Sequence, residues 1–404
     1  MTRKPEKLVF CSYPHKNKLT LGKKMTAKKN IVLFWFMNDW GKYGRAYEEI
    51  ALALSKHPNT GLVTCVLPPV KAHDQQFMAA IHRHTKNLMV ITPFWQSINK
   101  SGIGYRLRTW FNQKYPPLTL IRLYLYFKGY SKDNTVLWIY PPHQFIPELI
   151  NNIPHKTLVT QIVDNNSFRT DASYKIAFSK LQYDELSQSA NLVITSSAVN
   201  YSIFSKLNNN CLFIENGVSE RFISTPSDFP FKKNNTQPRL GYLGFISQRT
   251  DIELIRHVAL MRPNCLLLIA GPDEGIVEPS GITELPNVKY IGPVPHIQAP
   301  SFLRNLDICL IPHKDNEYSR SMSPLKLFQY LASGRPIVST RVAGTERWGD
   351  LVMLSESYDT FVRNIDMTFE TDNLEKSAMR IEAVKAENWN NRVDHMVNKL
   401  MELD

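Results

Sequence analysis

The sequence of 404 residues has few cysteines and no long apolar run, and both shortages limit what the protein can be. Its five cysteines are scattered without C-x-x-C spacing, which argues against common zinc and disulfide frameworks and predicts buried free thiols in a reducing, cytoplasmic compartment. No stretch approaches the roughly 18 uninterrupted apolar residues of a membrane-spanning helix. The basic segment 1–29 lacks the apolar centre of a secretory signal, so we expect it to be a flexible leader.

Acidic residues are also in short supply. Lys and Arg total 48 against 36 Asp and Glu, which gives a formal net charge of +12. This excess favours anionic partners such as nucleotides or an acidic membrane surface. Because the positive charge is spread along the chain and no nucleic-acid-binding module is recognisable, nucleic acid is not an expected partner. No aspartate-rich metal motif is present in the sequence, and we expect neither a metal nor a cofactor.

Apolar runs alternate with helical patterns along most of the chain. The run IVLFWFM is typical of a strand buried on both faces, and a helical pattern and a second apolar run follow it. This β–loop–α–β order opens a doubly wound α/β domain. The polar segment 219–238 interrupts the series, which then starts again. We therefore predict an N-terminal domain over 30–218 and a C-terminal domain over 239–380, facing each other across a cleft.

The stretch SRSMSPLKLFQYLASGRPIVST, residues 319–340, places a lysine in the first turn of a predicted helix. Ser323 suits the N-cap and Pro324 the first helical position. Lys326 is then the third helical residue, at the positive end of the helix dipole, where carboxylates are favoured. Backbone N–H groups, the hydroxyls of Ser321 and Ser323, and the lysine together predict a phosphate site. The alternative is an ordinary capped helix with solvated cations.

Glycines and cations follow two other predicted strands. In GYLGFISQR, Gly244 ends a strand and Arg249 precedes a helix, an arrangement that suits a diphosphate and equally an ordinary tight turn. In NDWGKYGR, Gly41 and Gly44 could make room for a ligand beside Arg45 above the first strand. That loop lacks the full G-x-G-x-x-G fingerprint, so it does not predict NAD binding.

Three further polar residues follow apolar runs. Asp164 comes directly after one, where its carboxylate could position an acceptor hydroxyl or simply cap its own turn. His143 follows WIYPP and His296 follows GPVP. Each histidine is a candidate acid–base or ligand residue, although a lone histidine is more often a polar loop residue.

The tract 105–130 mixes basic and aromatic residues. It could rest on an anionic bilayer surface, with its aromatic rings at the interface and its cations near the headgroups. The alternative, which we favour, is a packed helix whose inner face carries Leu120, Leu123, Tyr124 and Phe127.

Nine motifs follow one another along residues 30–395, namely LWIYPP, ANLVITSS, IENGV, GYLGFISQRTDIELI, LLIAGP, NVKYIGPVP, DICLIPHKDNE, SPLKLFQYLASGRPIVST and NWNNRV. In this order the chain resembles the nucleotide-sugar glycosyltransferases of the GT-B fold, in the group that includes bacterial polysaccharide-building enzymes of the teichuronic-acid type. The resemblance implies two Rossmann-like domains facing a central cleft, with the donor on the C-terminal domain and the acceptor on the N-terminal one. It also implies a terminal helix, over 381–404, that returns to the N-terminal domain.

Matching positions imply roles for individual residues. Arg249 and Lys326 would face the donor diphosphate together with the turn at Ser321–Ser323. The glycines Gly244 and Gly271 would lie against the donor. The loop with Gly41, Gly44 and Arg45 would lie on the acceptor side.

The resemblance breaks down at two positions. The family usually carries a glutamate where this chain has Gln329, which would lie near the nucleotide ribose, and many members carry another where Ser321 stands. An amide keeps an acceptor oxygen but loses the charge, so its bond to a ribose hydroxyl should be weaker. Glu317, from the preceding loop, is a candidate replacement.

The resulting expectation is a metal-independent hexosyltransferase, with Asp164, Arg249 and Lys326 as catalytic residues. It would move a sugar from a nucleoside diphosphate to a hydroxyl of a glycan or lipid-linked acceptor in surface polysaccharide biosynthesis. The resemblance implies retention of anomeric configuration. The cysteines and the tract 105–130 predict a cytoplasmic protein that could lie at the inner face of the plasma membrane. Two alternatives stay open: a GT-B sugar-nucleotide epimerase, and a non-catalytic protein that binds nucleotide sugars.

Overall fold

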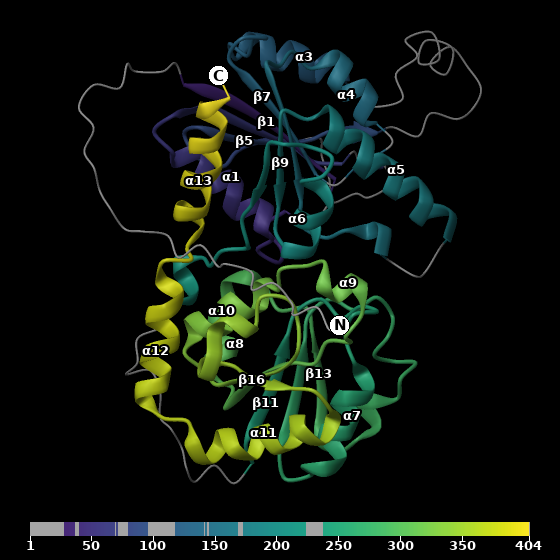
Figure 1. Ribbon diagram of the computed structural model, residues 1–404, viewed down its shortest axis with the longest axis vertical. Helices are drawn as coiled ribbons and strands as arrows, with labels where there is room; N and C mark the ends of the chain where they lie inside the picture. The colour runs from purple at the N-terminus through teal and green to yellow at the C-terminus, as the bar shows by residue number, and fades with distance from the viewer. Residues whose placement is uncertain are drawn as a thin grey trace, which may run out of the picture.

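The protein consists of two α/β domains, one above the other in Figure 1. This computed structural model describes residues 28–36, 40–68, 70–71, 80–95, 118–140, 142–143, 145–168, 173–223 and 237–403. Most of the predicted leader (1–27), residues 105–117 of the basic and aromatic tract, and residues 224–236 of the predicted linker lie outside the described residues. The predicted α/β architecture is confirmed.

The first domain is built on an eight-stranded sheet in the order β10-β9-β8-β7-β1-β2-β5-β4. Its strands are β1 (Lys29–Trp35), β2 (Thr60–Val66), β4 (Ala80–Arg83), β5 (Leu88–Thr92), β7 (Thr135–Tyr140), β8 (Thr157–Ile162), β9 (Leu192–Thr195) and β10 (Cys211–Phe213). All neighbours are parallel except β4 and β5, and β3 (Val70–Lys71) pairs with β6 (Phe94–Trp95) separately. The helices are α1 (Ala46–Lys56), α3 (Leu118–Phe127), α4 (Ile146–Asn152), α5 (Ser173–Ser189) and α6 (Ala198–Phe204).

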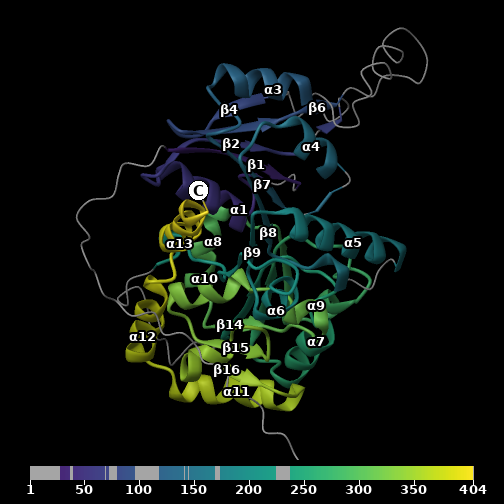
Figure 2. The same cartoon turned by 45° about the horizontal axis from the view of Figure 1, so that its top comes forward.

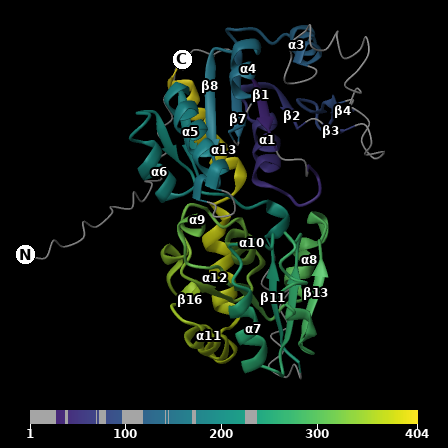
Figure 3. The same cartoon turned by 90° about the vertical axis from the view of Figure 1, so that its right-hand side faces the viewer.

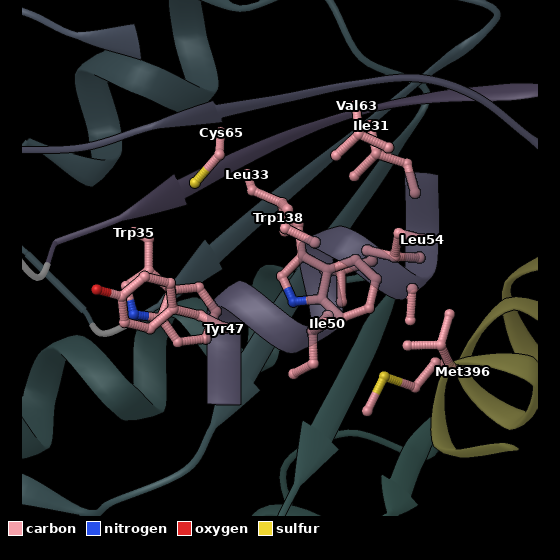
Figure 4. Close-up of a cluster of buried hydrophobic side chains, with 14 of the residues drawn as sticks. Ile31, Leu33, Trp35, Tyr47, Ile50, Leu54, Val63, Cys65, Trp138 and Met396 are labelled. Carbon is pink, nitrogen blue, oxygen red and sulfur yellow. The ribbon is translucent and has the colours of Figure 1, made fainter. Parts of the chain in front are cut away.

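The run IVLFWFM forms the central strand because both of its faces are covered. Ile31, Leu33 and Trp35 join one core with α1, whereas Val32 and Phe34 join a second core with α3, α4 and α5. Figure 4 shows the first of these cores, with Met396 of the C-terminal helix reaching it from the side. Side chains of a strand alternate between faces, so a strand apolar at every position requires helices on both sides.

The second domain repeats this plan with a six-stranded parallel sheet in the order β13-β12-β11-β14-β15-β16. Its strands are β11 (Arg239–Leu243), β12 (Leu266–Ala270), β13 (Val288–Gly292), β14 (Ile308–Ile311), β15 (Ile337–Thr340) and β16 (Met353–Ser355). Its helices are α7 (Ile252–Met261), α8 (Ala299–Arg304), α9 (Glu317–Arg320), α10 (Leu325–Ser333) and α11 (Tyr358–Thr371). Helices α7 and α11 cover one face, and α8 and α10 cover the other, as Figure 2 shows for α11.

The chain ends in two helices that belong to different domains. Helix α12 (Leu374–Lys385) packs against α10, and α13 (Trp389–Glu402) packs against α1 of the first domain. The predicted terminal helix over 381–404 is therefore interrupted at 386–388. At this break the backbone lies beside the outgoing connection, because Val218 N donates to Glu387 O at 2.9 Å and Val218 forms a bridge with Asn388.

The predicted inner face of helix α3 is wrong except at Tyr124, which is half-buried against the core. Leu120, Leu123 and Phe127 are exposed, and Phe127 keeps 80% of its surface in solvent. Ile121 and Leu125 are the buried members of this helix, along with Leu118 at its start. Almost every residue of LTLIRLYLYF is apolar, so two opposite faces fit the helical spacing equally well and the sequence pattern could not choose between them. Within the described residues, no helix combines the length and apolarity needed to cross a bilayer.

The four cysteines among the described residues are free thiols, and three of them are buried. This agrees with the predicted free thiols, although Cys211 is only half-buried and Cys11 lies outside the described residues.

Candidate donor and acceptor pocket

A pocket of about 200 Å³ lies between the two domains. Trp35 and Tyr140, the last residues of β1 and β7, line it from the first domain, and Leu243 at the end of β11 lines it from the second. Ligands of open α/β sheets bind at these carboxyl ends. Figure 3 shows α9 and α10 at the upper end of the second domain, facing the first. Among the residues predicted for the site, the pocket is lined by Arg45, Asp164, Gly244, Arg249, Gly271, Ser323, Lys326 and Gln329.

The start of helix α10 differs by one residue from the prediction. Pro324 is the N-cap with an extended backbone, so Lys326 is the second helical residue and not the third. Ser323 makes no cap; its hydroxyl oxygen accepts a hydrogen bond from the backbone N–H of Asn216 at 3.2 Å. The partner that displaced the cap comes from the other domain, which local spacing in the sequence does not reveal.

Lys326 turns its ammonium toward two side chains of its own domain. Nζ donates to the Tyr242 hydroxyl at 2.5 Å and lies 2.9 Å from His313 Nε2. Burial lowers the pKa of Lys326 well below its usual range, and the nearby charge of Arg249 lowers it further. A bound anion would stabilise the charged form of this buried lysine strongly, because opposite charges attract each other more strongly in a buried site than in water.

Two glycines lie beside this lysine, and Gly244 leaves the space that the lysine occupies. A Cβ on Gly244 would lie 2.8 Å from Lys326 Nζ. Gly271 has φ +135°, and a Cβ there would lie 1.9 Å from the carbonyl oxygen of Gly244. Neither position tolerates a side chain without moving its neighbours, so both glycines bring backbone to the edge of the pocket.

Arg249 joins the two domains across the pocket. Its Nη1 lies 3.3 Å from Asp164 Oδ1 and 3.3 Å from Met322 Sδ, and its guanidinium lies over the ring of Tyr318. Burial acts to lower the pKa of Arg249, but the Asp164 carboxylate and neighbouring tyrosines outweigh it and raise that pKa. The backbone of Asp164 is fixed in turn, because the Tyr183 hydroxyl donates to its carbonyl at 2.9 Å.

The turn at Ser321–Ser323 is bonded to the first domain. The Ser321 carbonyl accepts hydrogen bonds from Ser197 Oγ at 2.8 Å and from Asn200 Nδ2 at 2.7 Å. Asn216 Nδ2 donates to the Ser323 carbonyl at 2.7 Å. The Ser321 side chain is fully buried and its hydroxyl donates to a backbone carbonyl, so the structure places it outside the residues that line the pocket.

Three other predicted residues also lie outside the lining. Glu317 is exposed on α9, and the N–H of Gly41 donates to Glu48 Oε1 at 2.8 Å. Gly44 has φ +60°, and a Cβ there would lie 2.1 Å from the ring of His296. The lining does include His296, which also lies 3.5 Å from Glu49.

Arg45 and His143 have aromatic neighbours. The guanidinium of Arg45 lies 5.5 Å from the ring centroid of Phe245, so this pair also spans the two domains. His143 stacks on Phe36 with 4.3 Å between ring centroids, outside the lining, and burial lowers its pKa.

The sequence prediction missed several residues that shape the pocket, among them His313, Tyr242, Tyr318, Trp35 and Asn216. His313 carried a usable signal, because it follows the strand run DICLIP just as Asp164 follows its own strand. Tyr242 and Tyr318 carried no such signal, since an aromatic residue near a strand end is as typical of a hydrophobic core as of a pocket. Within the described ranges, no group of three or more His, Cys, Asp and Glu side chains is arranged to hold a metal ion.

Comparison with known proteins agrees with this geometry. Residues 237–368 match the protein family described as "Glycosyl transferases group 1". A Bacillus subtilis (strain 168) protein, provisionally named the teichuronic acid biosynthesis glycosyltransferase TuaH, is 34% identical over 140 residues. That match covers 33% of this chain and 35% of the TuaH chain, so it spans about a third of each protein.

Similar solved structures extend the likeness to nearly the whole fold. Sucrose-phosphate synthase from Thermosynechococcus elongatus superposes with a TM-score of 0.70 at 14% identity, covering 93% of this chain and 99% of that one. Anabaena HepE, solved with UDP and glucose, superposes with a TM-score of 0.65 at 13% identity, and the match covers 93% of this chain and 100% of the HepE chain. TarM superposes with a TM-score of 0.65 at 12% identity, and the match covers 94% of this chain and 99% of the TarM chain. The chain therefore has the GT-B fold, and residues 237–368 of its second domain match the group 1 glycosyl transferases.

Proposed function

We propose that the protein is a glycosyltransferase of surface polysaccharide biosynthesis. It transfers a sugar from a nucleoside diphosphate to a hydroxyl group of a glycan or lipid-linked acceptor. The observation that carries this proposal is the pocket between the domains, in which Arg249, Lys326 and the N-terminal end of α10 converge. The family match over residues 237–368 and the partial match to TuaH support the same activity.

The donor diphosphate would bind on the second domain. Arg249 and Lys326 both present cations to the pocket, and the backbone N–H groups at the start of α10 add partial positive charge. The difficult part of the reaction is the departure of a diphosphate, whose negative charge grows as the sugar bond breaks. Two fixed cations and a helix end stabilise that charge without reorganising during the reaction, so we propose that no metal is needed.

The remaining predicted contacts concern the sugar, the ribose and the acceptor. Gln329 lines the pocket one turn beyond Lys326, where its amide oxygen can accept a hydrogen bond from the ribose. Asp164 lines the opposite side and would orient the acceptor hydroxyl, beside Arg45. Glu317 is exposed on α9, and nothing in its position supports a donor contact. We propose retention of anomeric configuration on the family resemblance.

Contact with the inner face of the plasma membrane is part of this proposal. Leu120, Leu123, Tyr126 and Phe127 are exposed along one side of α3, and Lys128 follows them. Exposed apolar and aromatic side chains with an adjoining cation suit the interface of an anionic bilayer. A lipid-linked acceptor would then be presented to the first domain.

The two alternatives are less well supported. An epimerase would use the same donor pocket but would need no acceptor, and a non-catalytic binder would need no Asp164. The family match and the partial match to TuaH are both to glycosyltransferases, which favours transfer.

Incubation with labelled UDP-, GDP- and dTDP-sugars, with and without a lipid-linked glycan, separates the three functions. Transfer that requires acceptor supports the proposal. Free sugar or an isomerised donor without acceptor supports the epimerase, and binding without turnover supports the binder. Repeating the assay in EDTA tests metal independence, since activity should persist, and the anomeric configuration of the product by NMR tests retention.

A further inference from the structure

We propose that His313 is a positioning residue for the donor site, which holds the Lys326 ammonium in place for the diphosphate. The inference rests on the proposed function. His313 was not among the residues expected from the sequence, although it follows the strand run DICLIP.

His313 is itself rigidly placed. It follows β14 by two residues, with only 3% of its surface exposed. Its backbone is tied on both sides to Thr340 at the end of β15, because its N–H donates to Thr340 Oγ1 at 3.1 Å and that hydroxyl donates to its carbonyl at 2.8 Å. The imidazole is therefore a fixed partner, whereas a lysine side chain is flexible and loses rotamer freedom when it is held in one place.

The contact with Lys326 defines the tautomer of this ring. While Lys326 carries its charge, its ammonium group can only donate, so His313 Nε2, 2.9 Å from Lys326 Nζ, accepts. The ring is then neutral and carries its proton on Nδ1. Burial, Lys326 and Arg249 all lower the pKa of His313, which agrees with the neutral form. Among the described residues, Nδ1 has no hydrogen-bond partner.

Two of the three N–H bonds of Lys326 are thereby assigned. One points to His313 Nε2 and one to the Tyr242 hydroxyl, so the third is left for an oxygen atom of the donor. Tyr242 also places its ring under the ammonium, with 3.9 Å from Nζ to the ring centroid. These contacts fix Lys326 before the donor arrives, which reduces the entropy lost on binding.

The test compares two buried amides at this position. His313→Gln puts an amide near the position of Nε2 and keeps an acceptor for Lys326, whereas His313→Asn places its polar atoms near Nδ1 and removes that acceptor. Binding of UDP, GDP and dTDP is measured by calorimetry, with the matching nucleosides as controls. We expect His313→Asn to weaken binding of the preferred diphosphate about tenfold. His313→Gln should stay within about threefold of the natural protein, and nucleoside binding should not change.

A double-mutant cycle with Lys326→Ala distinguishes positioning from general damage. If His313 acts through the lysine, adding His313→Asn to Lys326→Ala should weaken binding no further. Thermal melting of each variant shows whether it folds. If His313→Asn does not fold, the test is made with His313→Gln, and a folded His313→Gln variant that weakens diphosphate binding more than about threefold would overturn the role. A His313→Asn variant that melts cooperatively and binds diphosphate as the natural protein does would overturn the role, as would additive losses in the cycle. Failure of the natural protein to bind any of the three diphosphates would instead overturn the proposed function, and the role of His313 with it.

Discussion

Asp164 and Arg249 form an ion pair between the two domains, with 3.3 Å between Oδ1 and Nη1. The sequence singled out each residue for a separate task, the carboxylate for the acceptor and the guanidinium for the donor. In the structure they neutralise each other across the pocket. A diphosphate carries more negative charge than one carboxylate, so its binding would draw Arg249 away and leave Asp164 to meet the acceptor hydroxyl.

Asp164→Asn should therefore strengthen the binding of a nucleoside diphosphate while it slows transfer. The gain should be about two- to fivefold, the size expected when a partly exposed ion pair no longer competes. Calorimetry with UDP, GDP and dTDP measures the affinity, and a transfer assay measures the rate. Asp315→Asn is the matched control, because Asp315 pairs with Arg320 on the surface. Weaker diphosphate binding by Asp164→Asn would contradict this competition.

Lys326→Ala should weaken diphosphate binding by about tenfold or more, since it removes a charge-assisted hydrogen bond. Its melting temperature should hold or rise slightly, because the change removes a cation from the positive end of α10. Calorimetry and thermal denaturation of the same preparation check both statements. Unchanged affinity in a folded variant would remove Lys326 from the donor site.

The affinity for diphosphate should fall as the pH rises. This fall should occur at a lower pH than the usual pKa of a lysine side chain would give. Burial and Arg249 lower the pKa of Lys326 in the empty pocket, whereas a bound diphosphate favours the charged form. Binding then takes up a proton, and a reaction that takes up protons weakens with rising pH. Calorimetry in buffers of different ionisation enthalpy measures that uptake. Lys326→Arg should flatten the pH dependence, because arginine stays charged. A natural protein without proton uptake would disprove this account.

Gly44→Ala should destabilise the protein more than Gly41→Ala. Both glycines have positive φ, so both variants meet a backbone cost of about 1–2 kcal/mol. Only the Cβ at Gly44 would strike the ring of His296, which belongs to the other domain. Thermal melting compares the two variants, and small-angle scattering tests whether Gly44→Ala separates the domains. Equal melting temperatures would mean that the contact with His296 contributes little.

The sequence predicted most of the strands because their cause is local. A run such as IVLFWFM needs burial on both faces, whichever helices supply it. A second local argument applies to Arg249 and Lys326, which follow β11 and β14 of one sheet, since the carboxyl ends of parallel strands meet at one edge; Asp164 follows β8 of the other sheet. The pairing of Asp164 with Arg249 was beyond reach, because it depends on how the domains face each other. The predicted N-cap at Ser323 was wrong for the same reason, because its hydroxyl oxygen accepts a hydrogen bond from the N–H of Asn216, 107 positions away in the other domain.

The passage of the chain between the domains has a mechanical consequence. The outgoing segment at Val218 and the returning segment at Glu387–Asn388 are hydrogen-bonded to each other, as two short strands would be. Two bonded crossings cannot swivel independently, so the domains can separate only by pivoting about this pair or by tearing it apart. The two crossing segments therefore move together, which limits how the two halves of the pocket can shift relative to each other.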